Sequence, residues 1–216
     1  MIRIVLAEDH AIVRKGIFAL LDEQSDLEVV GEASNGHEAL AVVDSTRPDI
    51  VVMDINMPEL NGLEATRQIR KQYPEVKVLV LTMYTNEEYV LNLLQAGAAG
   101  YIVKESIPAE LINAIKAIHA GNAYLSPAVS RNVIDEYLRN VGDEGATDTF
   151  DRLTDREREI MQLLVEGSST KEIADKLSIS SKTVGVHRVN LMEKLEVNSM
   201  PDLVKYALRK GMISLD

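Results

Sequence analysis

Five polar residues that suit phosphate chemistry follow apolar runs, each of which is typical of a buried strand. Glu8 and Asp9 follow the first run, Asp54 the third, Thr82 the fourth and Lys104 the fifth. Because the carboxyl ends of parallel strands meet at one edge of a sheet, we expect these side chains to converge there. Three carboxylates in one pocket raise one another's pKa unless a cation lies among them. The pattern therefore predicts an acidic, cation-binding pocket.

Oxygen donors without cysteine favour a hard divalent ion, and Mg²⁺ is the expected cofactor. Its predicted ligands are Glu8, Asp9, Asp54 and the backbone carbonyl of Asn56. A carboxylate beside such an ion can accept a phosphoryl group as an acyl phosphate, and Asp54 is the best-placed candidate. We expect the Lys104 ammonium and the Thr82 hydroxyl to bind the phosphoryl oxygens.

A single Asp, Thr or Lys at a strand end is ordinarily a helix cap or a turn residue. The interpretation therefore depends on the whole set, with each member after the appropriate strand. His10 and His37 are expected to be surface residues rather than metal ligands.

The surrounding elements are predicted from hydrophobic periodicity. Strands are expected at residues 2–7, 27–31, 50–53, 76–81 and 100–103, and helical apolar spacing lies between them. Asn35, Asn61 and Thr85 are each followed by Glu three residues later, a pattern typical of helix starts. Five strands alternating with five helices predict a doubly wound, five-stranded parallel sheet, hence an α/β fold.

Residues 1–120 resemble the receiver domain of a two-component response regulator, which has a flavodoxin-like fold. The motifs that carry the resemblance are Ala7-Glu8-Asp9-His10, Met53-Asp54-Ile55-Asn56-Met57-Pro58, Asn61-Gly62, Leu81-Thr82 and Tyr101-Ile102-Val103-Lys104. The resemblance implies that the phosphohistidine of a sensor histidine kinase donates to Asp54, and that Thr82 and Tyr101 reorient as the switch. Two positions depart from the commonest pattern: Met83, where a small residue is frequent, and Glu105, where proline is frequent.

The net charge of −11 argues against nucleic-acid binding only if it is averaged over the chain. Residues 1–120 hold 10 Lys or Arg and 18 Asp or Glu, whereas residues 151–216 hold 11 of each. We place a linker at residues 121–150, with a helix at 127–140 that has one apolar face. Residues 141–151 are acidic and contain glycine, which favours a hinge.

The last 66 residues, 151–216, are predicted to form a small all-α domain of four helices. Thr154 with Glu157, and Ser169 with Glu172, have the spacing of capping boxes. The second and third helices are separated by three or four residues, as in a helix-turn-helix. The third helix, at about residues 182–195, has no acid before Glu193 and presents a surface suited to a major groove. That surface comprises Lys182, Gly185, Val186, Arg188, Val189 and Asn190.

This domain resembles the LuxR-type helix-turn-helix of the NarL/FixJ branch. The motif here includes Leu153-Thr154-x-Arg156-Glu157, Glu166-Gly167, Glu172-Ile173-Ala174, Leu177, Lys182-Thr183-Val184-x-Val186-His187 and Lys194-Leu195. The resemblance implies backbone contacts from Lys182 and Thr183, base contacts from Val186 and Val189, and a His187 that packs inside. The candidate DNA-binding residues are Lys171, Lys182, Thr183, Val186, Arg188, Val189, Asn190 and Lys194. Gly185 stands where Glu, Lys or Arg is common.

The favoured hypothesis is a phosphorylation-controlled transcription regulator that binds double-stranded promoter DNA as a homodimer and is not an enzyme. RNA polymerase is a further expected partner. No apolar run approaches the ~20 residues of a membrane span and no signal peptide is evident, so we expect a cytoplasmic protein without membrane contact. Two alternatives stay open: a phosphorylation-independent adaptor or constitutive DNA binder, favoured only by Met83, and a small hydrolase that uses the carboxylate cluster.

Overall fold

The computed structural model describes residues 1–83, 93, 95–127, 129–130, 149–210 and 212–213. The chain divides into two compact units, Met1–Gly142 and Asp143–Asp216. This division falls within the predicted linker, although the domain limits at residues 120 and 150 stay predictions. Most of the predicted linker helix, most of the hinge and the cap at Thr85 lie outside the described residues.

The N-terminal unit contains one parallel sheet of six strands in the order β2-β1-β3-β4-β5-β6. The predicted doubly wound parallel sheet is confirmed. The strands are β1 (Ile2–Ala7), β2 (Leu27–Ala33), β3 (Ile50–Asp54), β4 (Lys77–Thr82), β5 (Gly100–Val103) and β6 (Tyr124–Leu125). The sixth strand was not predicted, because two residues are too short to give a periodic signal.

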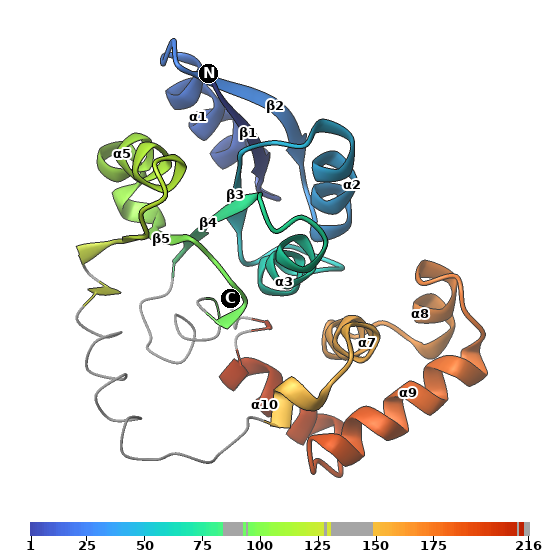
Figure 1. The fold of residues 1–216 in the computed structure, drawn as a ribbon. Coiled ribbons are helices and arrows are strands. Elements are labelled where there is room, and N and C mark those ends of the chain that lie inside the picture. The colour runs from blue at the N-terminus through green and yellow to red at the C-terminus, as the bar shows by residue number, and fades with distance from the viewer. Residues whose placement is uncertain (84–92, 94, 128, 131–148, 211, 214–216) are drawn as a thin grey trace. The chain divides into compact units, whose positions relative to one another are not determined.

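Helices cover both faces of this sheet (Figure 1). The described helices are α1 (Ala11–Asp22), α2 (Gly36–Thr46), α3 (Gly62–Gln72) and α5 (Ile107–His119). In β1, Ile4 and Leu6 pack in the cluster that contains α1 and α5, whereas Val5 and Ala7 pack in the cluster that contains α2 and α3. Strands buried on both faces are apolar throughout, which is why they appear in the sequence as continuous runs.

The backbone after β3 is fixed by a tight turn that leads into α3. The Asn61 side chain caps this helix by accepting a hydrogen bond from the Glu64 backbone N–H. The Gly62 N–H donates to the Ile55 carbonyl at 2.8 Å, and a Cβ on Gly62 would lie 1.9 Å from the Asp54 carbonyl oxygen. Only glycine allows α3 to start this close to Asp54, so Gly62 helps to hold that residue in place.

The C-terminal unit is helical, as predicted. It contains the 3₁₀ turn η2 (Thr149–Arg152) and the helices α7 (Asp155–Val165), α8 (Thr170–Lys176), α9 (Ser181–Lys194) and α10 (Met200–Lys210). Both predicted capping boxes are present, at Thr154 and at Ser169. One apolar cluster, which includes Ile160, Ile173 and Leu191, joins these helices.

A four-residue connection joins α8 to α9 and gives the helix-turn-helix. Ser178 adopts a left-handed backbone with φ of 53°, and the Ser180 side chain caps α9 by accepting from the Thr183 N–H. The Arg156 guanidinium, from α7, donates to the Leu177 carbonyl at 2.6 Å and ties the end of α8 to α7. Caps and this cross-link together fix the direction in which α9 leaves the turn.

Two glycines should respond oppositely to replacement by alanine. A Cβ at Gly185, inside α9, would meet nothing within 4 Å, whereas one at Gly62 would clash with backbone. We expect Gly185→Ala to raise the free energy of unfolding by about 0.5–1 kcal/mol. Gly62→Ala should lower it by about 1–3 kcal/mol. Urea unfolding of the full chain checks both, and equal shifts of the same sign would contradict the prediction.

Candidate functional site

The carboxyl edge of the sheet brings Asp54, Lys104 and Glu8 into direct contact. Asp54 ends β3 and is 2% exposed, Glu8 follows β1 and is fully buried, and Lys104 opens the 3₁₀ turn η1 (Lys104–Ser106) after β5. The Lys104 Nζ lies 3.0 Å from Asp54 Oδ1 and 2.8 Å from Glu8 Oε2. The structure thus places one ammonium between two buried carboxylates, at the edge that the sequence predicts.

Burial sets the electrostatics of this cluster. Desolvation raises the pKa of Asp54 to about 6, and the nearby Glu8 and Asp9 carboxylates act in the same direction, while Lys104 opposes them. For Lys104, burial disfavours the ammonium, but Asp54 and Glu8 outweigh it and raise its pKa above the ordinary value. A single lysine therefore does not fully compensate the acids around it, which leaves the cluster in excess of negative charge.

The donor atoms fit a hard divalent cation. Asp54 Oδ2 is buried and has no hydrogen-bond partner among the described residues. One ligand atom from each of Glu8, Asp9, His10 and Asp54 lies within 4.8 Å of the others. An acidic pocket of this kind is typical of a Mg²⁺ site. Asn56, whose carbonyl is the remaining predicted ligand, is half-buried in the turn that follows β3.

His10 has a place in this pocket that the sequence did not reveal. Its side chain is 69% exposed, as expected for a surface residue, but its Nδ1 lies 2.8 Å from Asp9 Oδ1 and 3.3 Å from Glu8 Oε1. The one available signal was its position directly after the two acids. A histidine beside carboxylates is common on surfaces, so that signal alone did not distinguish a pocket residue.

The two predicted switch residues contact each other. Thr82, which ends β4, and Tyr101, in β5, are both buried. Burial raises the pKa of Tyr101 to about 12, and a side-chain hydrogen bond with Thr82 acts in the opposite direction. Met83, directly after Thr82, is 56% exposed. The Thr82 hydroxyl is thus bonded to Tyr101, on the strand next to its own.

The predicted DNA-binding residues of α9 differ in exposure. Lys182, Val186, Val189 and Asn190 are exposed, and Lys171 in α8 is exposed as well. Thr183, Arg188 and His187 are half-buried, so His187 is less enclosed than the resemblance implies. The Thr183 side chain also lies 2.7 Å from the Ser180 hydroxyl, within the N-terminal cap of the helix.

Lys194 has a partner inside the domain. Its Nζ lies 2.6 Å from Glu157 Oε2, which connects the last turn of α9 to the first turn of α7. Burial alone would raise the pKa of Glu157, but the bonds from Lys194 and Thr154 outweigh it and lower that pKa. This ion pair spans 37 positions in the chain and has no sequence signal. A contact of Lys194 with DNA stays a prediction.

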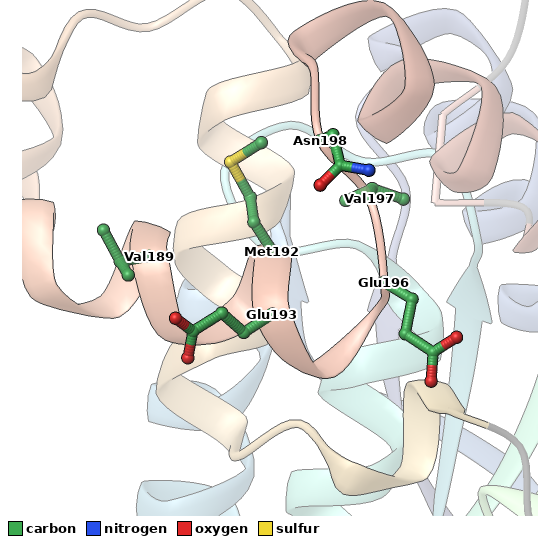
Figure 2. A pocket seen from close by; sticks show the side chains of 6 residues that line it. All are labelled: Val189, Met192, Glu193, Glu196, Val197 and Asn198. Carbon is green, nitrogen blue, oxygen red and sulfur yellow. The ribbon is translucent and has the colours of Figure 1, made fainter.

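Two surface hollows of about 460 Å³ adjoin α9. The first is lined by Lys182, Gly185, Val186, Val189 and Asn190. The second, shown in Figure 2, is lined by Val189, Met192, Glu193, Glu196, Val197 and Asn198. Val189 borders both, so a hollow that contains one lysine adjoins a hollow that contains two glutamates.

Family comparisons agree with the fold and with the order of the two domains. The model of the response regulator receiver domain matches residues 4–116, and that of bacterial regulatory proteins of the luxR family matches residues 151–207. A receiver followed by such a helix-turn-helix defines a transcription factor rather than a conventional enzyme, as the sequence predicts. The chain belongs to the response regulators with a luxR-family DNA-binding domain.

Individual relatives cover the chain closely. The oxygen regulatory protein NreC of Staphylococcus carnosus (strain TM300) is 41% identical over 214 residues, which are 98% of this chain and 99% of that protein. A LuxR-family response regulator from Aurantimonas sp. SI85-9A1 has a TM-score of 0.61 at 40% identity, over 64% of this chain and 99% of that one. A structure of two RcsB dimers bound to two parallel DNAs has a TM-score of 0.59 at 26% identity, over 96% and 98%.

None of the helices in the described part of the chain has the length and apolar character that crossing a membrane requires. This finding agrees with the lack of a long apolar run in the sequence.

The raised pKa of Asp54 makes a prediction for stability. A carboxyl whose pKa is higher in the folded than in the unfolded state stabilises the fold at low pH, and this contribution is lost as pH rises from about 4 through about 6. In EDTA, Asp54→Asn should raise the free energy of unfolding at pH 7.5 by about 2–3 kcal/mol. The gain should nearly vanish at pH 4.

Urea unfolding of the full chain at both pH values measures this effect. Asp26→Asn is the control. The hydrogen bond with Lys116 lowers the pKa of Asp26, so removal of this carboxylate should lower the free energy of unfolding at pH 7.5 rather than raise it. A gain for Asp54→Asn that is equal at pH 4 and pH 7.5 would show that charge burial is not its cause.

Proposed function

We propose that this response regulator is switched by phosphorylation of Asp54, with a sensor histidine kinase as the phosphoryl donor. The observation that carries the proposal is the buried contact of Asp54 Oδ1 with Lys104, which leaves Asp54 Oδ2 without a described partner. A carboxylate in this state has one oxygen held and one oxygen available for a cation or a phosphorus atom.

The donor set supports Mg²⁺ as the cofactor, held by Glu8, Asp9, Asp54 and the Asn56 carbonyl. A bound Mg²⁺ would supply positive charge that compensates the carboxylates and an incoming phosphoryl group. In the transfer, an Asp54 oxygen forms a bond to phosphorus as the bond from phosphorus to the donor's imidazole nitrogen breaks, and the imidazole takes up a proton. Lys104 is 3.0 Å from Asp54 and is placed to pair with the new phosphoryl oxygens.

Thr82 and Tyr101 are proposed as the switch. The Thr82 hydroxyl is bonded to Tyr101, and the oxygens of a phosphoryl group on Asp54 would compete for that hydroxyl. Movement of Thr82 toward them breaks its bond to a buried phenol, which must then find another position or partner. A local charge change is thereby coupled to packing at β5.

The output is proposed to be binding of double-stranded promoter DNA by a homodimer, through α8 and α9. The RcsB structure, in which two dimers bind two DNAs, supports this proposal, because RcsB aligns with 96% of this chain. Two recognition helices on one face of a duplex lie about 34–36 Å apart, which predicts paired half-sites.

We further propose the domain limits 1–120, 121–150 and 151–216, a cytoplasmic location and contact with RNA polymerase.

The phosphoacceptor is tested with a small-molecule phosphodonor such as acetyl phosphate. Wild type should acquire a hydroxylamine-labile phosphate when the reaction contains Mg²⁺ and none when it contains EDTA instead, and Asp54→Ala should acquire none in either case. Glu105→Gln, which removes an exposed carboxylate next to Lys104, is the matched control and should be labelled like wild type. Phosphate-affinity electrophoresis measures the labelled fraction.

The same samples test coupling to DNA. Coupling free energies between two sites are typically about 1–3 kcal/mol, so phosphorylation should tighten binding to a selected duplex by about 5–150-fold. Titration by fluorescence anisotropy measures this. Equal affinity of phosphorylated wild type and Asp54→Ala would refute the switch and favour the constitutive binder or adaptor, for which the exposed Met83 beside Thr82 is the motivating feature.

A further inference from the structure

We propose that α9 selects its half-site mainly by contacting thymine methyl groups, with apolar side chains, rather than by hydrogen bonds to guanine. This inference rests on the proposed DNA binding and specifies the class of base sequence that the helix reads. The argument uses the exposed apolar residues, the hollow beside them, the hydrogen-bonding groups at its edge and the charges that bound it.

Two large apolar side chains of α9 are exposed although the helix has a buried face of its own. Val186 is 52% and Val189 is 56% exposed, while Val184 and Leu191 on the same helix are fully buried in the core of the domain. Val186 and Val189 are three positions apart and therefore lie on one face, nearly opposite the core. Because the core does not use them, the fold alone gives no reason for valine at either position.

A hollow lies beside these valines, and Gly185 adds no side chain to it. Its lining consists of Lys182, Gly185, Val186, Val189 and Asn190. A Cβ at Gly185 would project into empty space, with no described atom within 4 Å, so no packing constraint requires glycine there. Glycine inside a helix costs about 0.5–1 kcal/mol relative to alanine. What this residue provides is an open space on the helix surface next to Val186 and Val189.

The bases offer one matching group. Among the base edges of the major groove, the C5 methyl of thymine is the apolar group, whereas guanine and cytosine present only hydrogen-bonding atoms there. Guanine is typically read by Arg or Lys in a bidentate arrangement, and the centre of this face, positions 185, 186 and 189, holds neither. At these three positions the surface is therefore suited to thymine and poorly suited to guanine, and Lys182 is the basic residue among those that line the hollow.

Polar groups at the edge of the hollow support the same sequence class. Asn190 is exposed, and an asparagine amide can pair bidentately with adenine, the partner of thymine. Lys182 is exposed in the first turn of α9, where an ammonium can contact a phosphate and position the helix. Arg188 does not line the hollow and is half-buried. An A·T pair thus meets a complementary group for each of its bases: a valine side chain for the thymine methyl and the Asn190 amide for adenine.

Charge limits how far along α9 the duplex extends. Glu193 and Glu196 are exposed at the second hollow, on the C-terminal side of Val189 (Figure 2). These carboxylates would repel phosphates, so the nucleic acid is expected to cover α9 from Lys182 to Asn190 and to leave the acidic end uncovered. Val189 is then the last apolar contact, and the footprint coincides with the first hollow.

The test compares thymine with deoxyuridine, which lacks only the C5 methyl. Duplexes bound by the phosphorylated full chain are first selected from random sequence, and each thymine of the half-site is then replaced singly. We expect deoxyuridine at one or two adjacent positions to weaken binding about fourfold, the factor for one buried methyl-sized group. Val186→Ala and Val189→Ala should each bring the ratio of the two affinities at one of these positions close to one.

Lys182→Ala is the matched control on the same helix face. It should weaken binding to the thymine and deoxyuridine duplexes alike, keep their ratio, and reduce the dependence of log affinity on log salt by about one unit. Because Lys182, Val186 and Val189 are all exposed, none of the three variants removes core packing, and far-ultraviolet circular dichroism verifies their helix content.

The outcomes separate this inference from the function on which it rests. Tight binding by wild type that is indifferent to deoxyuridine, selected half-sites without thymine, or an unchanged ratio in both valine variants would overturn methyl reading and leave DNA binding intact. Failure of wild type to bind any duplex, phosphorylated or not, would overturn the proposed function and this inference with it. In that case the exposed valines would instead be expected to contact a protein.

Discussion

The constraint on which the receiver depends is the burial of more negative than positive charge at one edge of its sheet. Glu8 and Asp54 are both buried, and Lys104 is the cation that lies between them. Desolvation pushes the pKa of Asp54 up to about 6 in spite of this contact. The fold thus holds Asp54 in an environment in which its charged form is destabilised, and a bound divalent cation would relieve that cost. The same excess charge explains why the pocket suits metal-dependent phosphate chemistry.

Sheet topology makes this arrangement possible from residues far apart in sequence. Glu8 and Lys104 are separated by 96 positions, yet parallel strands place the residues that follow β1 and β5 at the same edge. This is why the members of the cluster could be predicted from strand ends alone, as could the helix starts at Asn35, Asn61, Thr154 and Ser169, whose caps depend on neighbours three residues away. The central strands were recognisable because burial on both faces makes them almost continuously apolar, whereas the edge strand β2 contains exposed glutamates.

Other features have a weak local signal or none, and were not predicted. The pairing of Lys194 with Glu157 depends on how α9 packs against α7, and a lysine near the end of a helix otherwise suggests a phosphate contact. The contact between Thr82 and Tyr101 depends on the register of β4 and β5, which pairs Val80 with Tyr101. His10 was assigned to the surface from its residue type, and only the geometry shows its ring nitrogen beside Asp9. The first two contacts are set by tertiary packing, whereas the contact of His10 is with its neighbour in the chain and was not distinguishable from that of an ordinary surface histidine.

The two units differ in how closely function is tied to stability. In the receiver, Asp54 and Glu8 are buried, so any substitution there changes folding and chemistry together. In α9, the orientation of the helix is fixed by the Ser180 cap at one end and the Lys194–Glu157 pair at the other, and its core face is filled by Val184 and Leu191. Positions 185, 186 and 189 lie outside these contacts. Substitution at these positions should therefore change the proposed base contacts while the helix-turn-helix stays folded, whereas a substitution in the acidic pocket alters stability and chemistry together.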